Sequence, residues 1–118
     1  MVINLKDKCG KQTITREDGQ VINDMIVQAW DIEERIVIDF SNILIASVSF
    51  LDEAFGKLSF YFPKDILIKK LYFDNIQDYD RALLNDIFIS RYHQKELGEN
   101  GYSKPKRRKL IRRSASKR

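Results

Sequence analysis

Two serines and two carboxylates lie close together in the segment Ser47-Val-Ser-Phe-Leu-Asp-Glu53. A serine hydroxyl can accept a phosphoryl group, or it can cap a helix by accepting a hydrogen bond from a backbone N–H. Ser49 stands three residues before Asp52, the spacing of a capping box with Asp in place of Glu. We therefore predict that Ser49 caps a helix. Ser47 is then the more exposed candidate for phosphorylation, and Ser49 is the second candidate.

Asp52 and Glu53 are adjacent, which argues against an acid–base pair. Neighbouring residues of a helix point in different directions, and no histidine, cysteine or second carboxylate cluster is spaced to assist them. Acidic side chains in the first turn of a helix oppose its positive dipole end. We interpret both carboxylates as capping and partner-contacting groups, and we predict that the chain is not an enzyme.

Metal and cofactor sites are not indicated. The chain has one histidine, His93, and one cysteine, Cys9, whereas a zinc site needs about four ligands. It contains no Gly-x-Gly-x-x-Gly, Walker A or Gly-x-Ser-x-Gly motif. We therefore expect no metal and no cofactor. Because one cysteine allows no internal disulfide, and because no signal-peptide pattern or transmembrane stretch is present, we expect a cytoplasmic protein.

Charge divides the chain into an acidic body and a basic tail. Residues 1–102 hold all 17 acidic residues and 12 of the 21 basic ones, so their net charge is 12 − 17 = −5, and residues 103–118 hold nine basic residues and no acid. Such a tail can neutralise the phosphates of a nucleic acid, and binding of this kind depends strongly on salt. Because no aromatic residues are interleaved with the basic ones, we expect any nucleic-acid binding to be non-specific. An acidic partner or the acidic body are alternative targets. The candidate nucleic-acid-binding residues are Lys104, Lys106, Arg107, Arg108, Lys109, Arg112 and Arg113.

Hydrophobic spacing predicts the elements that position these groups. Short strands are expected over residues 2–5 and 11–14, and Thr15, with Asp18 three residues later, should cap the first helix. Residues 35–40 form a β-branched apolar run typical of a central strand. Asp39 lies inside this run, so its carboxylate should reach the strand end or be hydrogen-bonded. A helix over 50–62 ended by Pro63, a strand over 65–73 and a helix from about 76 to 92 complete the order.

The alternation of strands and helices predicts the α/β class. We expect a roughly four-stranded mixed sheet with three helices packed on it, formed by residues 1–97. Residues 98–118 should form a flexible basic tail, because this segment cannot bury a core.

The segment from Ile38 to Leu58 resembles the STAS-like family of small bacterial proteins known as DUF4325. Members carry a strand of the Leu-Asp-Phe type, a Ser-rich turn, and Phe-x-Asp-Glu-x-Phe-Gly-x-Leu opening a helix. Here residues 49–58 read Ser-Phe-Leu-Asp-Glu-Ala-Phe-Gly-Lys-Leu. Thr15-Arg-Glu-Asp18 is similar to the opening of the family's first helix, and Asn75 falls where the family places an Asn after the last strand. The resemblance covers residues 10–95 at the level of element order.

This resemblance implies a role in regulation. STAS domains include anti-anti-sigma factors, in which a kinase phosphorylates a serine in the turn before a helix and so controls partner binding. That turn corresponds to residues 47–49, with the serine column on or near Val48 and Phe50 in place of the usual glycine. The resemblance also implies a histidine-kinase-like ATPase as partner.

Together these observations predict a non-enzymatic, STAS-like protein-interaction domain that binds and controls a signalling partner. The expected partner-binding residues are Ser47, Val48, Ser49, Asp52 and Glu53. We expect no membrane partner. The alternative is a nucleic-acid-associated accessory protein in phage defence or counter-defence that acts through its basic tail.

Overall fold

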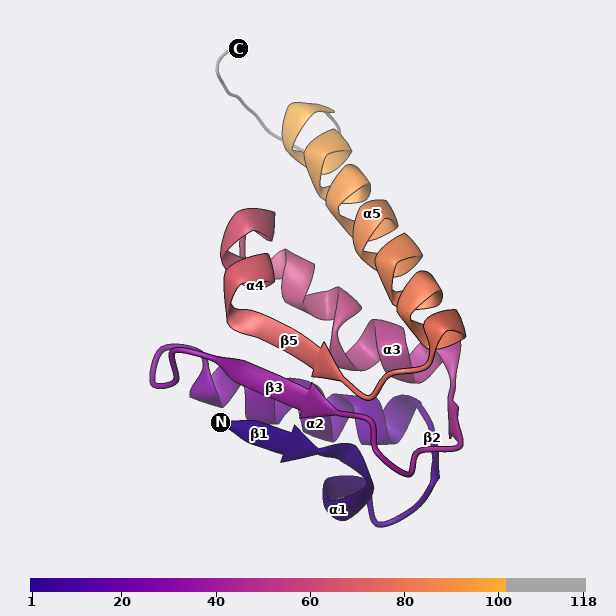
Figure 1. Ribbon diagram of the computed structural model, residues 1–118. Coiled ribbons are helices and arrows are strands. Elements are labelled where there is room, and N and C mark those ends of the chain that lie inside the picture. Colours follow the sequence, from indigo (N-terminus) through magenta and orange to yellow (C-terminus); the bar gives the residue numbers. More distant parts are fainter. Residues whose placement is uncertain (102–118) are drawn as a thin grey trace. The chain divides into compact units, whose positions relative to one another are not determined.

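The computed structural model describes residues 1–101, with side chains for residues 1–97 (Figure 1). The chain divides into the units Met1–Phe88 and Ile89–Arg118. The described part contains five α-helices, five strands and one 3₁₀ helix. In chain order they are β1 (Val2–Asn4), α1 (Leu5–Cys9), β2 (Thr13–Ile14), α2 (Arg16–Ala29), β3 (Ile36–Asp39), β4 (Ile45–Ala46), α3 (Val48–Ala54), η1 (Gly56–Phe60), α4 (Lys64–Lys70), β5 (Leu71–Asp74) and α5 (Asp78–Gly101).

The main sheet has three parallel strands in the order β1-β3-β5. A second, smaller sheet pairs β2 with β4, also in parallel. The α/β class is therefore confirmed. The expected four-stranded mixed sheet with three helices is wrong for the described residues, because residues 13–14 pair with 45–46 in a separate sheet and additional short helices form.

One face of the main sheet forms the core of the Met1–Phe88 unit. Side chains alternate across a strand, and the inward ones at Ile3, Ile36 and Ile38 are fully buried. They belong to the same hydrophobic cluster as Phe50 and Phe55 of the α3 region. Figure 1 shows α2 behind the strands of this sheet. Each such buried side chain contributes roughly 1.5–3 kcal/mol through removal from water.

Helix α2 begins as expected. Thr15 is its N-cap, and the backbone N–H of Thr15 donates to Oδ2 of Asp18 at 2.9 Å. Gly19 lets α2 approach α3 closely, since a Cβ at this position would lie 2.9 Å from the carbonyl oxygen of Phe50. The buried Asn23 donates through Nδ2 to the carbonyl of Ala54 at 3.2 Å and ties the same two helices together.

Two predictions downstream of α3 are wrong. The expected helix over 50–62 is split into α3 and η1 around Phe55, and the expected strand over 65–73 is mostly helix α4, with β5 only from Leu71. Pro63, with φ −63° and ψ 151°, is the N-cap of α4. Leu67 is the buried residue of α4, whereas Ile66 and Ile68 are exposed.

The structure describes only the first part of the segment that was predicted to form the tail. Helix α5 runs to Gly101, past the expected domain end at residue 97. Residues 102–118 lie outside the described residues, so the seven basic candidates for nucleic-acid binding lie there as well. Among the described residues, no helix combines the length and the apolar character that a membrane crossing requires.

Candidate functional site

The turn from β4 into α3 is held rigidly. The backbone N–H of Ser47 donates to the carbonyl of Ile14 at 3.1 Å, which ties the turn to β2. Ser47 is the N-cap of α3, and its Oγ accepts a hydrogen bond from the backbone N–H of Phe50 at 3.0 Å. The prediction that Ser49 is the cap is therefore wrong, because the chain enters the helix two residues earlier. Asp52 does not complete a capping box, since it lies five residues after the cap.

The two candidate phosphorylation sites lie side by side. The Oγ atoms of Ser47 and Ser49 are 3.1 Å apart and form a hydrogen bond, and both residues are half-buried. Ser47 therefore has two roles in the unmodified chain, capping α3 and bonding to Ser49. A phosphate on Ser47 would have to replace its capping hydrogen bond.

Glu53 joins three elements. Its Oε1 lies 3.2 Å from Nη1 of Arg16, and its Oε2 lies 2.9 Å from Nζ of Lys57. The hydrogen bond to Glu53 raises the pKa of Lys57. The Glu53 side chain is only 12% exposed. Glu53, predicted to contact a partner, thus already serves to hold α2, α3 and η1 together.

Asp52 lies over the start of η1. A Cβ at Gly56 would come within 2.5 Å of Asp52 Oδ1 and within 2.8 Å of Ile87 Cγ2. Gly56 is therefore a point of close approach between the α3 region and α5. Asp52 is half-buried, and its carboxylate belongs to this packed region.

The exposed part of the turn is apolar. We define the apolar turn surface as Leu44, Ile45 and Val48, whose exposed fractions are 64%, 58% and 55%. Val48 is one of the predicted partner-binding residues, whereas Leu44 and Ile45 were not predicted to contact a partner. Their pattern of two exposed residues between buried Ile43 and Ala46 follows from the separate β2–β4 pair, which the chain's periodicity does not indicate.

A second group of polar residues gathers at the carboxyl ends of the three parallel strands. We call Asn4, Asp39, Ser41 and Asn75 the polar latch. Oδ1 of Asp39 accepts from the backbone N–H of Ser41 at 2.9 Å, from its Oγ at 2.7 Å and from Nδ2 of Asn75 at 2.9 Å. Oδ2 accepts from Nδ2 of Asn4 at 3.2 Å. The prediction that Asp39 reaches the strand end or is hydrogen-bonded is confirmed on both counts.

These hydrogen bonds keep Asp39 ionised. Those from Asn75 and Ser41 lower the pKa of Asp39 from 3.8 to about 2. Asn75 occupies the left-handed region with φ 57°, which Asn tolerates better than most residues. The amide of Asn75 also donates to Ser41 Oγ at 3.0 Å, so this strained turn is held by the same network.

The remaining question is whether other described residues could bind a metal ion or act as a nucleophile. Among the described residues, no group of three or more His, Cys, Asp or Glu side chains could hold a metal ion. Burial raises the pKa of the Cys9 thiol, which makes it a weaker nucleophile at neutral pH. The described residues thus present two features. One is the apolar turn surface beside the hydroxyls of Ser47 and Ser49, and the other is the Asp39 carboxylate, held by the hydrogen bonds of the polar latch.

Comparison with known proteins places the chain in a family. The model of the STAS-like domain of unknown function (DUF4325) matches residues 18–81, more than half of the chain. The match covers α2 from residue 18 onward, the turn into α3, and β5. No curated protein and no solved structure matches the chain. The chain belongs to the family of STAS-like domains, DUF4325.

Proposed function

We propose that this chain is a non-enzymatic regulatory domain of the cytoplasm that binds a signalling protein through the turn between β4 and α3. The observation that carries the proposal is the apolar turn surface. Its three side chains are more than half exposed and lie within five residues of one another. The cores of protein interfaces are apolar and depleted in charged residues. The apolar turn surface has this composition.

The rigidity of the turn supports the same proposal. The backbone N–H of Ser47 bonds the turn to β2, and the Ser47 side chain caps α3. Gly19 allows α3 to pack closely against α2. A surface that is already ordered loses little conformational entropy when a partner binds. The two serines are held within the same rigid segment, so a change in their charge would be transmitted directly to the binding surface.

The partner that we propose is a histidine-kinase-like ATPase, because the resemblance to anti-anti-sigma factors implies this class. Phosphorylation of Ser47 or Ser49 would be the switch. A phosphate would bring a charge near −2 next to the apolar turn surface. On Ser47 it would also displace the cap of α3. Both effects would weaken binding of an apolar partner surface.

The test is an exchange of one exposed valine for a charge. Val48→Asp should weaken binding of a histidine-kinase-like ATPase by about tenfold or more, which calorimetry measures directly. Val21→Asp is a matched control, because Val21 is 53% exposed on α2 and lies outside the turn. Equal affinity of the two variants would refute the turn as the binding surface.

The phosphorylation switch has its own test. Mass spectrometry of the chain after incubation with the same ATPase and ATP should find a phosphate on Ser47 or Ser49. The double variant Ser47→Ala with Ser49→Ala removes both hydroxyls and serves as the control. Phosphate at neither serine, or an equal amount in the double variant, would exclude the switch while leaving the binding surface in place.

The basic tail supports a second candidate function. Its nine basic residues and absence of acids favour nucleic acid as an additional or alternative partner. A chain shortened to residues 1–102 should lose nucleic-acid binding, and binding of the full chain should fall steeply with salt. If the shortened chain binds equally well, the tail is not the binding segment.

A further inference from the structure

The second face of the main sheet is uncovered in the Met1–Phe88 unit. The strand register aligns Val2, Val37 and Tyr72 in one row and Asn4, Asp39 and Asp74 in the next, all on the face opposite the core. We call these two rows the open sheet face. Val2 is 65% and Tyr72 is 38% exposed, whereas Ile3 and Ile38 on the other face are fully buried.

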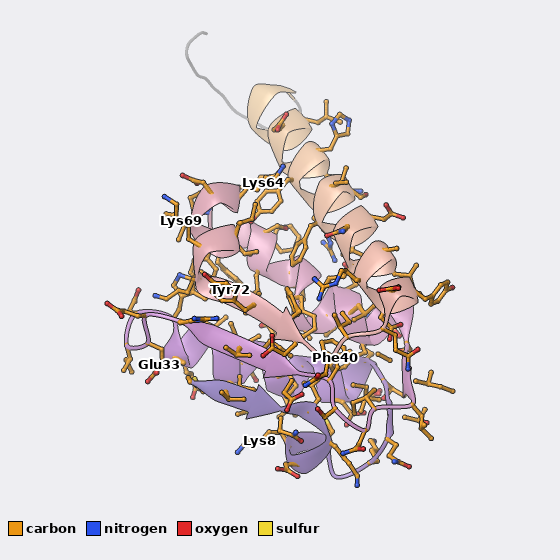
Figure 2. All side chains as sticks on the ribbon, in the orientation of Figure 1. Lys8, Glu33, Phe40, Lys64, Lys69 and Tyr72 are labelled. Atoms are coloured by element: carbon orange, nitrogen blue, oxygen red, sulfur yellow. The ribbon has the colours of Figure 1, made fainter. Side chains whose placement is uncertain are left out.

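A parallel sheet with one bare face is unusual. Parallel sheets occur almost only where both faces are covered, because the helices that connect their strands pack on those faces. Here an apolar row crosses all three strands on the bare face. In Figure 1 the described helices of this unit leave the near side of β1 and β3 free, and Figure 2 shows Tyr72 on β5 beside them. This face therefore has the composition of an interface.

The charges around the row differ from one end to the other. At the carboxyl end lie Asp39 and Asp74, and neither forms an ion pair with another described residue. The donors to Asp39 are the neutral groups of the polar latch, so its negative charge is not cancelled. Toward the other end, the guanidinium of Arg35 lies 4.1 Å from the centre of the Tyr72 ring. A complementary occupant needs a cationic side chain at the carboxyl end.

The size of the open sheet face decides between kinds of occupant. Three strands about 4.8 Å apart, each about three residues long and with two residues on this face, give a platform roughly 14 Å wide and 10 Å long. One α-helix with its side chains is about 10–12 Å wide. A stable dimer buries on the order of 800 Å² per partner, several times the platform's area. The platform is therefore large enough for a helix and too small to hold a second copy of the chain by itself.

We propose that the open sheet face binds one amphipathic helix of a partner protein, with lysine or arginine directed at Asp39 and Asp74. The apolar stripe of this helix lies along Val2, Val37 and Tyr72. The surface shares no residue with the apolar turn surface, so the proposal goes beyond the regulatory function above. It provides a second contact, either for the same partner or for another protein.

The probe for the test is a designed helical peptide of about 14 residues, with a leucine stripe and lysines along one side of that stripe, facing the row of Asp39 and Asp74. A matched peptide carries glutamate in place of the lysines. Binding to the full chain is followed by ¹⁵N chemical-shift changes. We expect shifts in β1, β3 and β5, and an affinity about tenfold higher for the lysine peptide. Equal affinities, shifts confined to other elements, or no binding at millimolar peptide would overturn the proposal.

Variants locate the site. Val37→Asp and, at the more exposed position, Val2→Asp should abolish binding of the lysine peptide, while Val21→Asp and Val48→Asp should leave it intact. Circular dichroism checks that each variant is folded. Because Val48→Asp affects only the turn, failure of this proposal and failure of the proposed function are distinguishable. Sedimentation showing a dimer that Val37→Asp dissolves would make a second copy the occupant and would refute the helix.

Discussion

Replacing Asn75 by glycine should raise the pKa of Asp39 and lower stability together. In the intact polar latch, Asn75 Nδ2 donates to Asp39 Oδ1 at 2.9 Å, and this bond contributes most to the lowered pKa. The difference between 3.8 and about 2 corresponds to about 2.5 kcal/mol at most, at roughly 1.4 kcal/mol per pKa unit. Loss of this one donor should raise the pKa by roughly one unit and cost about 1 kcal/mol.

Glycine is the informative replacement because of the backbone. Asn75 has φ 57°, a conformation that glycine adopts without strain. Asn75→Gly therefore removes the side-chain hydrogen bonds, while the backbone can still adopt the turn conformation. Asn75→Ala should lower the free energy of unfolding by about 1 kcal/mol more, because alanine disfavours the left-handed region. The comparison of the two variants separates the hydrogen bonds from the backbone strain.

The pH dependence of stability follows from the sign of the shift. Because the pKa of Asp39 is lower in the folded chain, its stabilising contribution is full above the unfolded value of 3.8 and is lost as the pH falls toward about 2. The deficit of Asn75→Gly relative to the parent chain should be largest at neutral pH and should shrink below pH of about 3. ¹³C NMR of the Asp39 carboxyl carbon and urea unfolding at several pH values measure both quantities. A pKa that stays at about 2 in Asn75→Gly would refute the reasoning.

Three further substitutions test the packing around the turn. Gly19→Ala should destabilise the chain by about 1–3 kcal/mol in thermal unfolding, since its Cβ would lie 2.9 Å from the carbonyl oxygen of Phe50; an unchanged melting temperature would contradict the close approach. Ser47→Ala should cost about 1 kcal/mol through loss of the α3 cap, whereas Ser49→Ala should cost less, and the reverse order would restore Ser49 as the cap. Glu53→Gln should lower the pKa of Lys57 and cost under about 1 kcal/mol in 0.1 M salt, and an unchanged Lys57 pKa would contradict the ion pair.

Local signals in the sequence identified several elements correctly. Thr15 with Asp18 predicted the start of α2, and the β-branched run of residues 36–39 predicted β3. Leu51, Ala54, Phe55 and Leu58, apolar residues at helical spacing within the helix expected over residues 50–62, are all buried. These cases share one cause, because each pattern was decided by residues close together in the chain.

The errors arose where local preference and long-range packing disagree. Residues 65–70 are rich in isoleucine and leucine and favour a strand, yet only Leu67 is buried, and the segment is helical after Pro63. A short apolar run of this length cannot be assigned by periodicity. The Ser47 cap likewise depends on the pairing of β4 with β2, a contact between residues more than thirty positions apart.

The prediction of candidate site residues was also limited to what local patterns indicate. Val48, one of the predicted partner-binding residues, is exposed at the start of α3, whereas Glu53 is held by two cations, and Leu44 and Ile45 were not among the predicted residues. The open sheet face was not foreseen, because Val37 and Tyr72 lie in two separate expected strands whose alignment no local pattern indicates. Only the strand register shows that they share a row with Val2.

The polar latch also distinguishes the correct strand alignment from its neighbours during folding. Its bonds join residues 35 and 36 positions apart, so they form only after long loops have closed. A slip of β1 by one residue would turn Ile3 toward the open sheet face and move Asn4 away from Asp39. The carboxylate would then lose one of its donors at the moment the apolar packing is also lost. Misaligned sheets thus carry two penalties, and the short three-residue strand β1 acquires a single preferred register.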